Sequence, residues 1–101
     1  MKINERILHI QILHLHVKEK YYKEVKENKK FSEYRLYKPY WIKRLAKDYD
    51  LIYYWRAYTK EKLIFKYSGK LIRIIKHTEF EDKPVKVFDI PLFAKDGVRR
   101  E

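Results

Sequence analysis

The most informative stretch of this chain, residues 28–45, reads NKKFSEYRLYKPYWIKRL. Residues 31–37 are predicted to form a β-strand, in which alternate side chains point to opposite faces. The alternation places Glu33 and Arg35 on one face of that strand. Proline follows soon after and ends it, and 39–47 is predicted to form a short helix with the proline in its first turn.

The same stretch carries more charge than a strand and a helix require. The candidate ligand-binding side chains are Lys30, Glu33, Arg35, Tyr37, Tyr40, Lys43 and Arg44. One interpretation is an exposed ion pair between Glu33 and Arg35, which contributes about 0–1 kcal/mol. The other is a charged cluster in a cleft, where Lys30 and Arg35 hold a phosphate or a base edge. Glu33 would then orient them or accept a proton.

Hydrophobic patterning on both sides of this stretch predicts an α+β domain of about six strands. A helix is expected over 18–27, and Asn28 suits the left-handed turn that ends it. Ser68-Gly69 has the composition of a hairpin turn between two strands. Many short strands with little glycine favour a small, curved, partly closed sheet. The remaining strands are expected over 7–17, 51–58, 62–67, 70–77 and 85–90.

Composition indicates one domain over residues 1–101, with a core over 7–92 and a flexible tail over 93–101. The chain has 25 Lys and Arg against 14 Asp and Glu, and this charge of +11 attracts polyanions such as nucleic acid. Eleven Lys and Arg against four Glu lie between residues 18 and 47. The absence of cysteine excludes disulfides and thiol catalysis. Polar residues interrupt the apolar N-terminal run, so we expect a cytoplasmic protein without a membrane span.

Three further features leave alternatives open. His14 and His16 share a strand face, and such a pair is more often a half-exposed sheet face than part of a metal site. Arg56 either reaches into the same cleft as Arg35 or stacks on a tyrosine. Trp41 either plugs the end of the sheet or stacks on bases. The sequence contains no phosphate loop and no string of metal ligands, so neither a metal nor another cofactor is expected.

Residues 28–35 resemble the G-x-K-x-x-E-x-R signature of ASCH domains, a group of PUA-like proteins. Residues 39–45 are similar to the P-Y-W-x-K-R-L segment of one branch of that family, and the likeness covers roughly 7–75. The charged signature positions are occupied by Lys30, Glu33 and Arg35. The resemblance implies a PUA-like β-barrel with a helix over one opening and a cleft lined by the signature.

The resemblance also implies a function, which is binding of nucleic acid, RNA above all, by a monomer or weak dimer. The alternative is a small hydrolase that acts on acylated cytidine nucleosides or on RNA, with Lys30 and Glu33 as its catalytic residues. The deacylase-like members carry a threonine nucleophile three residues after their lysine, where this chain has Glu33. Asn28 replaces the signature glycine. A third interpretation, from charge alone, is a basic module that binds an acidic protein.

Overall fold

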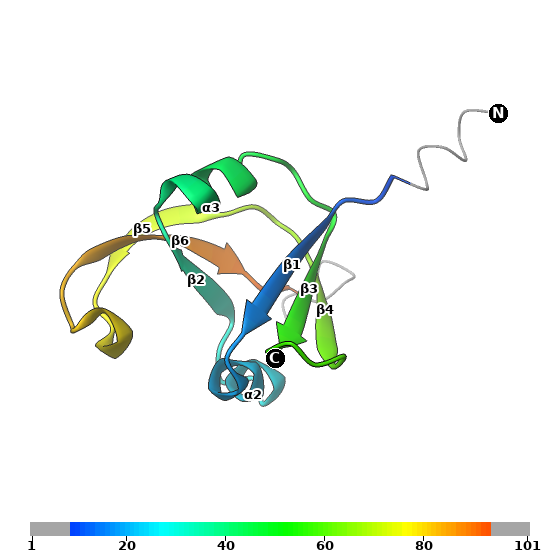
Figure 1. Cartoon of the computed structure of the whole chain (residues 1–101), viewed down its shortest axis with the longest axis horizontal. Helices are drawn as coiled ribbons and strands as arrows, with labels where there is room; N and C mark the ends of the chain where they lie inside the picture. The colour runs from blue at the N-terminus through cyan, green and yellow to red at the C-terminus, as the bar shows by residue number, and fades with distance from the viewer. Residues whose placement is uncertain (1–8, 94–101) are drawn as a thin grey trace.

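The computed structural model describes residues 9–93, which form an α+β domain (Figure 1). Within that range lie six strands in two three-stranded sheets and two α-helices. Their order is β1 (Ile12–Val17), α2 (Glu19–Lys26), β2 (Ser32–Leu36), α3 (Pro39–Arg44), β3 (Leu51–Arg56), β4 (Lys62–Lys66), β5 (Leu71–Ile75), the 3₁₀ turn η1 (Thr78–Phe80) and β6 (Val85–Pro91). The predicted class and strand number are confirmed.

The first sheet has the order β1-β3-β4, with β1 parallel to β3 and β4 antiparallel to it. Alternate residues of β1 and β3 are fully buried, among them Leu13, Leu15, Ile52 and Tyr54. These side chains form the centre of the core, and α2 packs Tyr22 and Val25 against it. The opposite face of the sheet is left with its polar and aromatic residues toward solvent.

The second sheet has the order β2-β6-β5 and is antiparallel throughout. A bridge between Lys66 and Phe93 joins it to the first sheet just beyond β6. Phe93 therefore belongs to the folded body, which corrects the expected tail at its first residue; residues 94–101 lie outside those described. In Figure 1, β5 and β6 extend together to one side and end at the short coil of η1.

The local signals around the two helices are confirmed. Asn28 has a φ of 60°, the left-handed conformation that ends α2. Pro39 occupies the first turn of α3, where its missing N–H costs no hydrogen bond. Because β2 connects α2 to α3, the two helices lie at opposite ends of that strand (Figure 1).

Two strand predictions are wrong in part. Residues 62–67 and 70–77 do not form a hairpin, because β4 pairs with β3 and β5 pairs with β6. Gly69 has a φ of +98°, and it lies in the short connection that passes the chain from one sheet to the other. The first strand begins at Ile12, and Ile10 before it is 53% exposed. The predicted start at Ile7 and Leu8 lies outside the described residues.

None of the helices described between residues 9 and 93 has the length and apolar character needed to cross a bilayer.

Candidate functional site

A cleft of about 560 Å³ opens between α2, β2, α3 and η1. Its lining holds six Lys or Arg side chains against three Glu. These charged residues are Lys18, Lys20, Lys29, Lys30, Arg35 and Lys38, with Glu24, Glu33 and Glu79. Rings line it as well, from Tyr21, Tyr34, Trp41 and Phe80. The cleft is therefore cationic and aromatic, with room for a ligand of nucleotide size.

Glu33 organises the floor of the cleft. It is only 6% exposed, and both of its oxygens accept bonds from the protein. Lys30 Nζ lies 3.1 Å and Tyr54 Oη 3.0 Å from Oε1, while Arg35 Nη2 lies 2.8 Å from Oε2. A buried carboxylate needs such partners, because removing it from water without them is costly. The predicted placement of Glu33 and Arg35 on one strand face is confirmed by their ion pair.

Lys30 is held between the strand and the helix. Besides Glu33, its ammonium donates to the carbonyl oxygen of Ser32. Its Nζ also lies 5.5 Å from the ring centroid of Tyr21 and 5.4 Å from that of Tyr34. These contacts fix the ammonium at the floor of the cleft.

A guanidinium–indole cluster closes the gap between β1 and β2. Arg35 donates to the carbonyl oxygen of His16 at 3.1 Å, and Arg44 to that of His14 at 2.6 Å. The strand β1 lies at the edge of its sheet, and its odd-numbered carbonyl groups accept hydrogen bonds from the β3 side. The carbonyl groups of His14 and His16 therefore point away from β3. The two guanidinium carbons lie 4.9 and 5.1 Å from the ring of Trp41.

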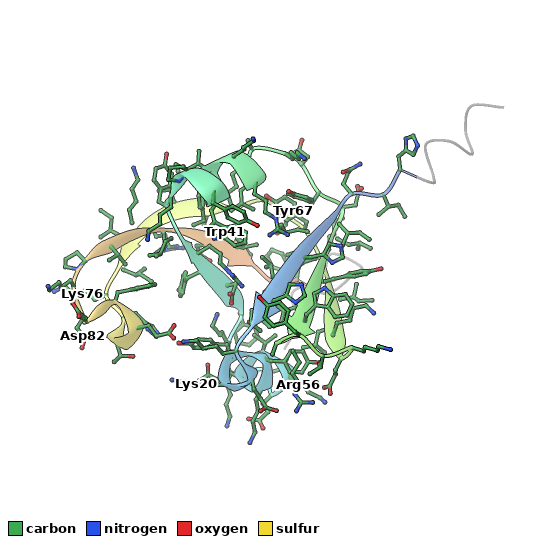
Figure 2. All side chains as sticks on the ribbon, viewed as in Figure 1. Lys20, Trp41, Arg56, Tyr67, Lys76 and Asp82 are labelled. Atoms are coloured by element: carbon green, nitrogen blue, oxygen red, sulfur yellow. The ribbon has the colours of Figure 1, made fainter. Side chains whose placement is uncertain are left out.

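Trp41 reaches from α3 toward the strands beneath it (Figure 2). Its ring is half-buried, packs against the core and also lines the cleft. Trp41 therefore covers the core on one side and contributes to the cleft surface on the other, and its stacking on bases stays a prediction.

The turn η1 forms one lip of the cleft and is tied to α2. Lys18 Nζ lies 2.5 Å from Glu79 Oε1 across the opening. The hydrogen bond and charge of Lys18 lower the pKa of the Glu79 carboxyl. Burial, and next the Glu79 carboxylate, raises the pKa of the Tyr21 hydroxyl. His77 accepts a hydrogen bond from the backbone N–H of Glu79 at 3.1 Å, which positions the turn.

Of the predicted ligand-binding residues, the structure brings Lys30, Glu33 and Arg35 to the cleft lining. Tyr37 lies outside it, with its ring 5.0 Å from that of Phe88. Tyr40, Lys43 and Arg44 are carried by α3 and are also absent from the lining. Arg44 donates to the Tyr40 hydroxyl at 3.1 Å, so these two side chains support Trp41 from outside.

Arg56 lies away from the cleft, which corrects the expectation that it reaches the same site as Arg35. Its guanidinium lies 2.6 Å from Glu19 and 3.3 Å from Glu61, and Figure 2 shows it beside α2. The ion pairs with Glu19 of α2 and with Glu61 hold the Arg56 guanidinium against the helix. It joins the first sheet to α2 instead of contacting a ligand.

The sequence interpretation missed much of the cleft lining. Lys20 is not among the predicted ligand-binding residues, and the polar residues of η1 carry no sequence signal that they return to α2. The period of a strand puts Tyr34 on the face opposite Glu33. In the structure its ring nevertheless lines the cleft, next to the ammonium of Lys30.

Across residues 9–93 there is no group of three or more His, Cys, Asp or Glu side chains that is arranged to hold a metal ion.

No protein-family model, no curated protein and no solved structure matches this chain. Membership of the ASCH family therefore stays a prediction from residues 28–45, and the chemistry of the cleft carries the assignment of function.

Proposed function

We propose that this protein binds nucleic acid, and RNA in particular, through the cleft between α2, β2, α3 and η1. The observation that carries the proposal is the buried Glu33, which holds Lys30 and Arg35 side by side at the floor of a cationic cleft. Two oriented cations suit a phosphate group, because charge-assisted hydrogen bonds to phosphate are short and strong.

The rest of the lining fits the same ligand. Lys18, Lys20, Lys29 and Lys38 surround the floor with positive charge, which attracts a phosphate backbone from a distance. The rings of Tyr21, Tyr34 and Trp41 offer surfaces on which a base can stack. The preference for RNA rests on the resemblance to ASCH domains, and with it we propose that the two sheets form a PUA-like barrel.

The geometry favours binding over the hydrolase alternative. Catalysis would require Lys30 as base or nucleophile and Glu33 as proton acceptor. Here both Glu33 oxygens accept bonds from protein donors, and the Lys30 ammonium acts as a donor to Glu33 and Ser32. Incubation with acylated cytidines separates the two functions. Turnover that Lys30→Ala abolishes favours the hydrolase, whereas unchanged substrate at high protein concentration favours the binding protein.

The binding test is a fluorescence anisotropy titration of labelled RNA between about 50 and 200 mM salt. Lys38 is the residue to replace, because it is exposed, lines the cleft and can be truncated without opening the buried cluster. Lys70→Ala is the matched control, since it removes the same charge from an exposed position outside the lining.

We expect Lys38→Ala to weaken binding and to reduce the slope of log K against log salt by about 0.7, the value for one lost contact to a single-strand phosphate. Lys70→Ala should leave both quantities near those of the wild type. Absence of RNA binding at low salt, or binding that does not depend on salt, overturns the proposal. Equal effects of the two variants would show that the charge acts through the whole surface and not through the cleft.

A further inference from the structure

A second surface lies outside the cleft, on the outer face of the sheet β1-β3-β4. There four rings follow one another in nearly parallel planes, in the order Tyr58, His16, Trp55 and His14. The centroid separations along the series are 4.8, 5.9 and 6.1 Å, with interplanar angles of 14°, 10° and 19°. We call this series the ring ladder. Tyr53 meets His14 edge-on beside it, at 5.5 Å.

Strand register creates the ring ladder. In the parallel pair, His16 lies opposite Trp55 and His14 opposite Tyr53, so their outward side chains are neighbours. Beyond β3 the chain turns at Ala57, whose φ is 47°, and this turn brings Tyr58 against His16. Two polar contacts hold the rings: Trp55 Nε1 donates to His14 Nδ1 at 3.0 Å, and His16 Nδ1 lies 2.9 Å from the Ala57 carbonyl oxygen.

The charge around the ring ladder is positive. The outward positions of these three described strands are Ile12, His14, His16, Leu51, Tyr53, Trp55, Lys62, Ile64 and Lys66, and none of them is Asp or Glu. Lys62 Nζ lies 4.8 Å from the Trp55 ring and 5.1 Å from the Tyr53 ring. A cation over aromatic rings on a face without carboxylates is complementary to a polyanion.

We propose that the ring ladder is a stacking platform for the bases of a single-stranded nucleic acid. Tyr58 ends the ladder and is 88% exposed, so a base can stack on the open face of its ring. Bases of a duplex already stack on their neighbours and do not offer that contact. A second copy of the chain is disfavoured as the occupant, because two molecules of charge +11 repel one another.

The platform extends the proposed RNA-binding function and rests on it. His16 belongs to the ring ladder and also lines the cleft, so the two surfaces adjoin at β1. One strand of RNA can thus place phosphates at the cleft and bases on the ladder. The platform supplies the preference for single strands, which the cleft cations alone do not provide.

Tyr58→Ala tests the platform with little risk to folding, because the side chain is exposed. Affinity is measured by anisotropy for three probes of equal length, about 12 nucleotides: a single-stranded RNA, the same backbone with abasic sites, and a duplex. We expect Tyr58→Ala to weaken binding of the single strand about fivefold or more, the effect of losing one stacked base. The abasic and duplex probes should bind both proteins equally.

Tyr58→Phe keeps the ring and should restore the affinity for the single strand. The salt slope distinguishes the two surfaces, because Tyr58→Ala should shift the line of log K against log salt in parallel, whereas Lys38→Ala should flatten it.

If single-strand affinity survives Tyr58→Ala, the platform is overturned while the cleft proposal stands. If Lys38→Ala has no effect but Tyr58→Ala does, the platform stands and the cleft proposal fails. A dimer that Tyr58→Ala dissociates, with RNA affinity unchanged, also overturns the platform.

Discussion

Replacing Glu33 by glutamine tests whether one buried carboxylate organises the cleft. The variant keeps the size of the side chain and removes its charge. Lys30 and Arg35, whose side chains are 19% and 20% exposed, then face each other across a neutral amide. The amide keeps one acceptor oxygen, but its NH2 group faces a donor, either Arg35 at the Oε2 position or Lys30 and Tyr54 at the Oε1 position.

We expect Glu33→Gln to lower the free energy of unfolding by about 3 kcal/mol, because breaking a buried ion pair leaves an uncompensated charge and costs about 3–5 kcal/mol. For a domain of this size the melting temperature should fall by roughly 12–24 °C. Urea unfolding followed by circular dichroism measures the change, since the slope m should stay constant while the midpoint moves.

Glu81→Gln is the matched control, because Glu81 pairs with Lys83 at 3.6 Å with both side chains more than 75% exposed. An exposed pair of this kind contributes about 0–1 kcal/mol. If Glu33→Gln costs no more than Glu81→Gln, the buried cluster does not hold Lys30 and Arg35 in place. That result would refute the role of Glu33 in organising the floor of the cleft.

Two further predictions concern pH. The pKa of the Glu79 carboxyl is lowered from its usual 4.5, first by the hydrogen bond from Lys18. The ionised carboxylate therefore contributes to stability above pH 4.5, and this contribution is lost as the pH falls through the lowered pKa. Glu79→Gln should remove that contribution, which is under about 1 kcal/mol for an exposed pair. Curves of unfolding free energy against pH that run parallel in acid for the wild type and the variant would contradict this prediction. Burial, then Glu61, raises the pKa of Tyr22 from 10.0 to about 12, so its contribution is present below pH 10 and is lost as pH rises toward 12. Tyr22→Phe should show a shallower loss of stability in urea titrations over that alkaline range, and an unchanged slope would argue against this assignment.

Features that depend on neighbours in the chain were predictable from the sequence. Alternation over 31–37 places Glu33 and Arg35 on one face because a strand has a period of two residues. The left-handed Asn28 and the proline at the start of α3 follow from backbone preferences that act within one turn. The charged cluster of Lys30, Glu33 and Arg35 is also visible in the sequence, but its placement in a cleft is what the resemblance to ASCH domains implies.

Contacts between distant segments were decided by tertiary structure. The sequence predicts a turn at Ser68-Gly69. Which strands pair on either side of it depends on how the whole chain buries its apolar faces, and in the structure β4 and β5 belong to different sheets. An ion pair between Lys18 and Glu79 holds η1 against α2, and an ion pair between Glu19 and Arg56 joins β3 to α2. The partners are 61 and 37 residues apart in the chain, so no local sequence pattern predicts these contacts. The ring ladder depends on the parallel register of β1 and β3, because only that pairing sets His16 beside Trp55. Periodicity and turn chemistry act within a few residues and so can be read from the sequence, whereas register and sheet partners minimise the free energy of the chain as a whole.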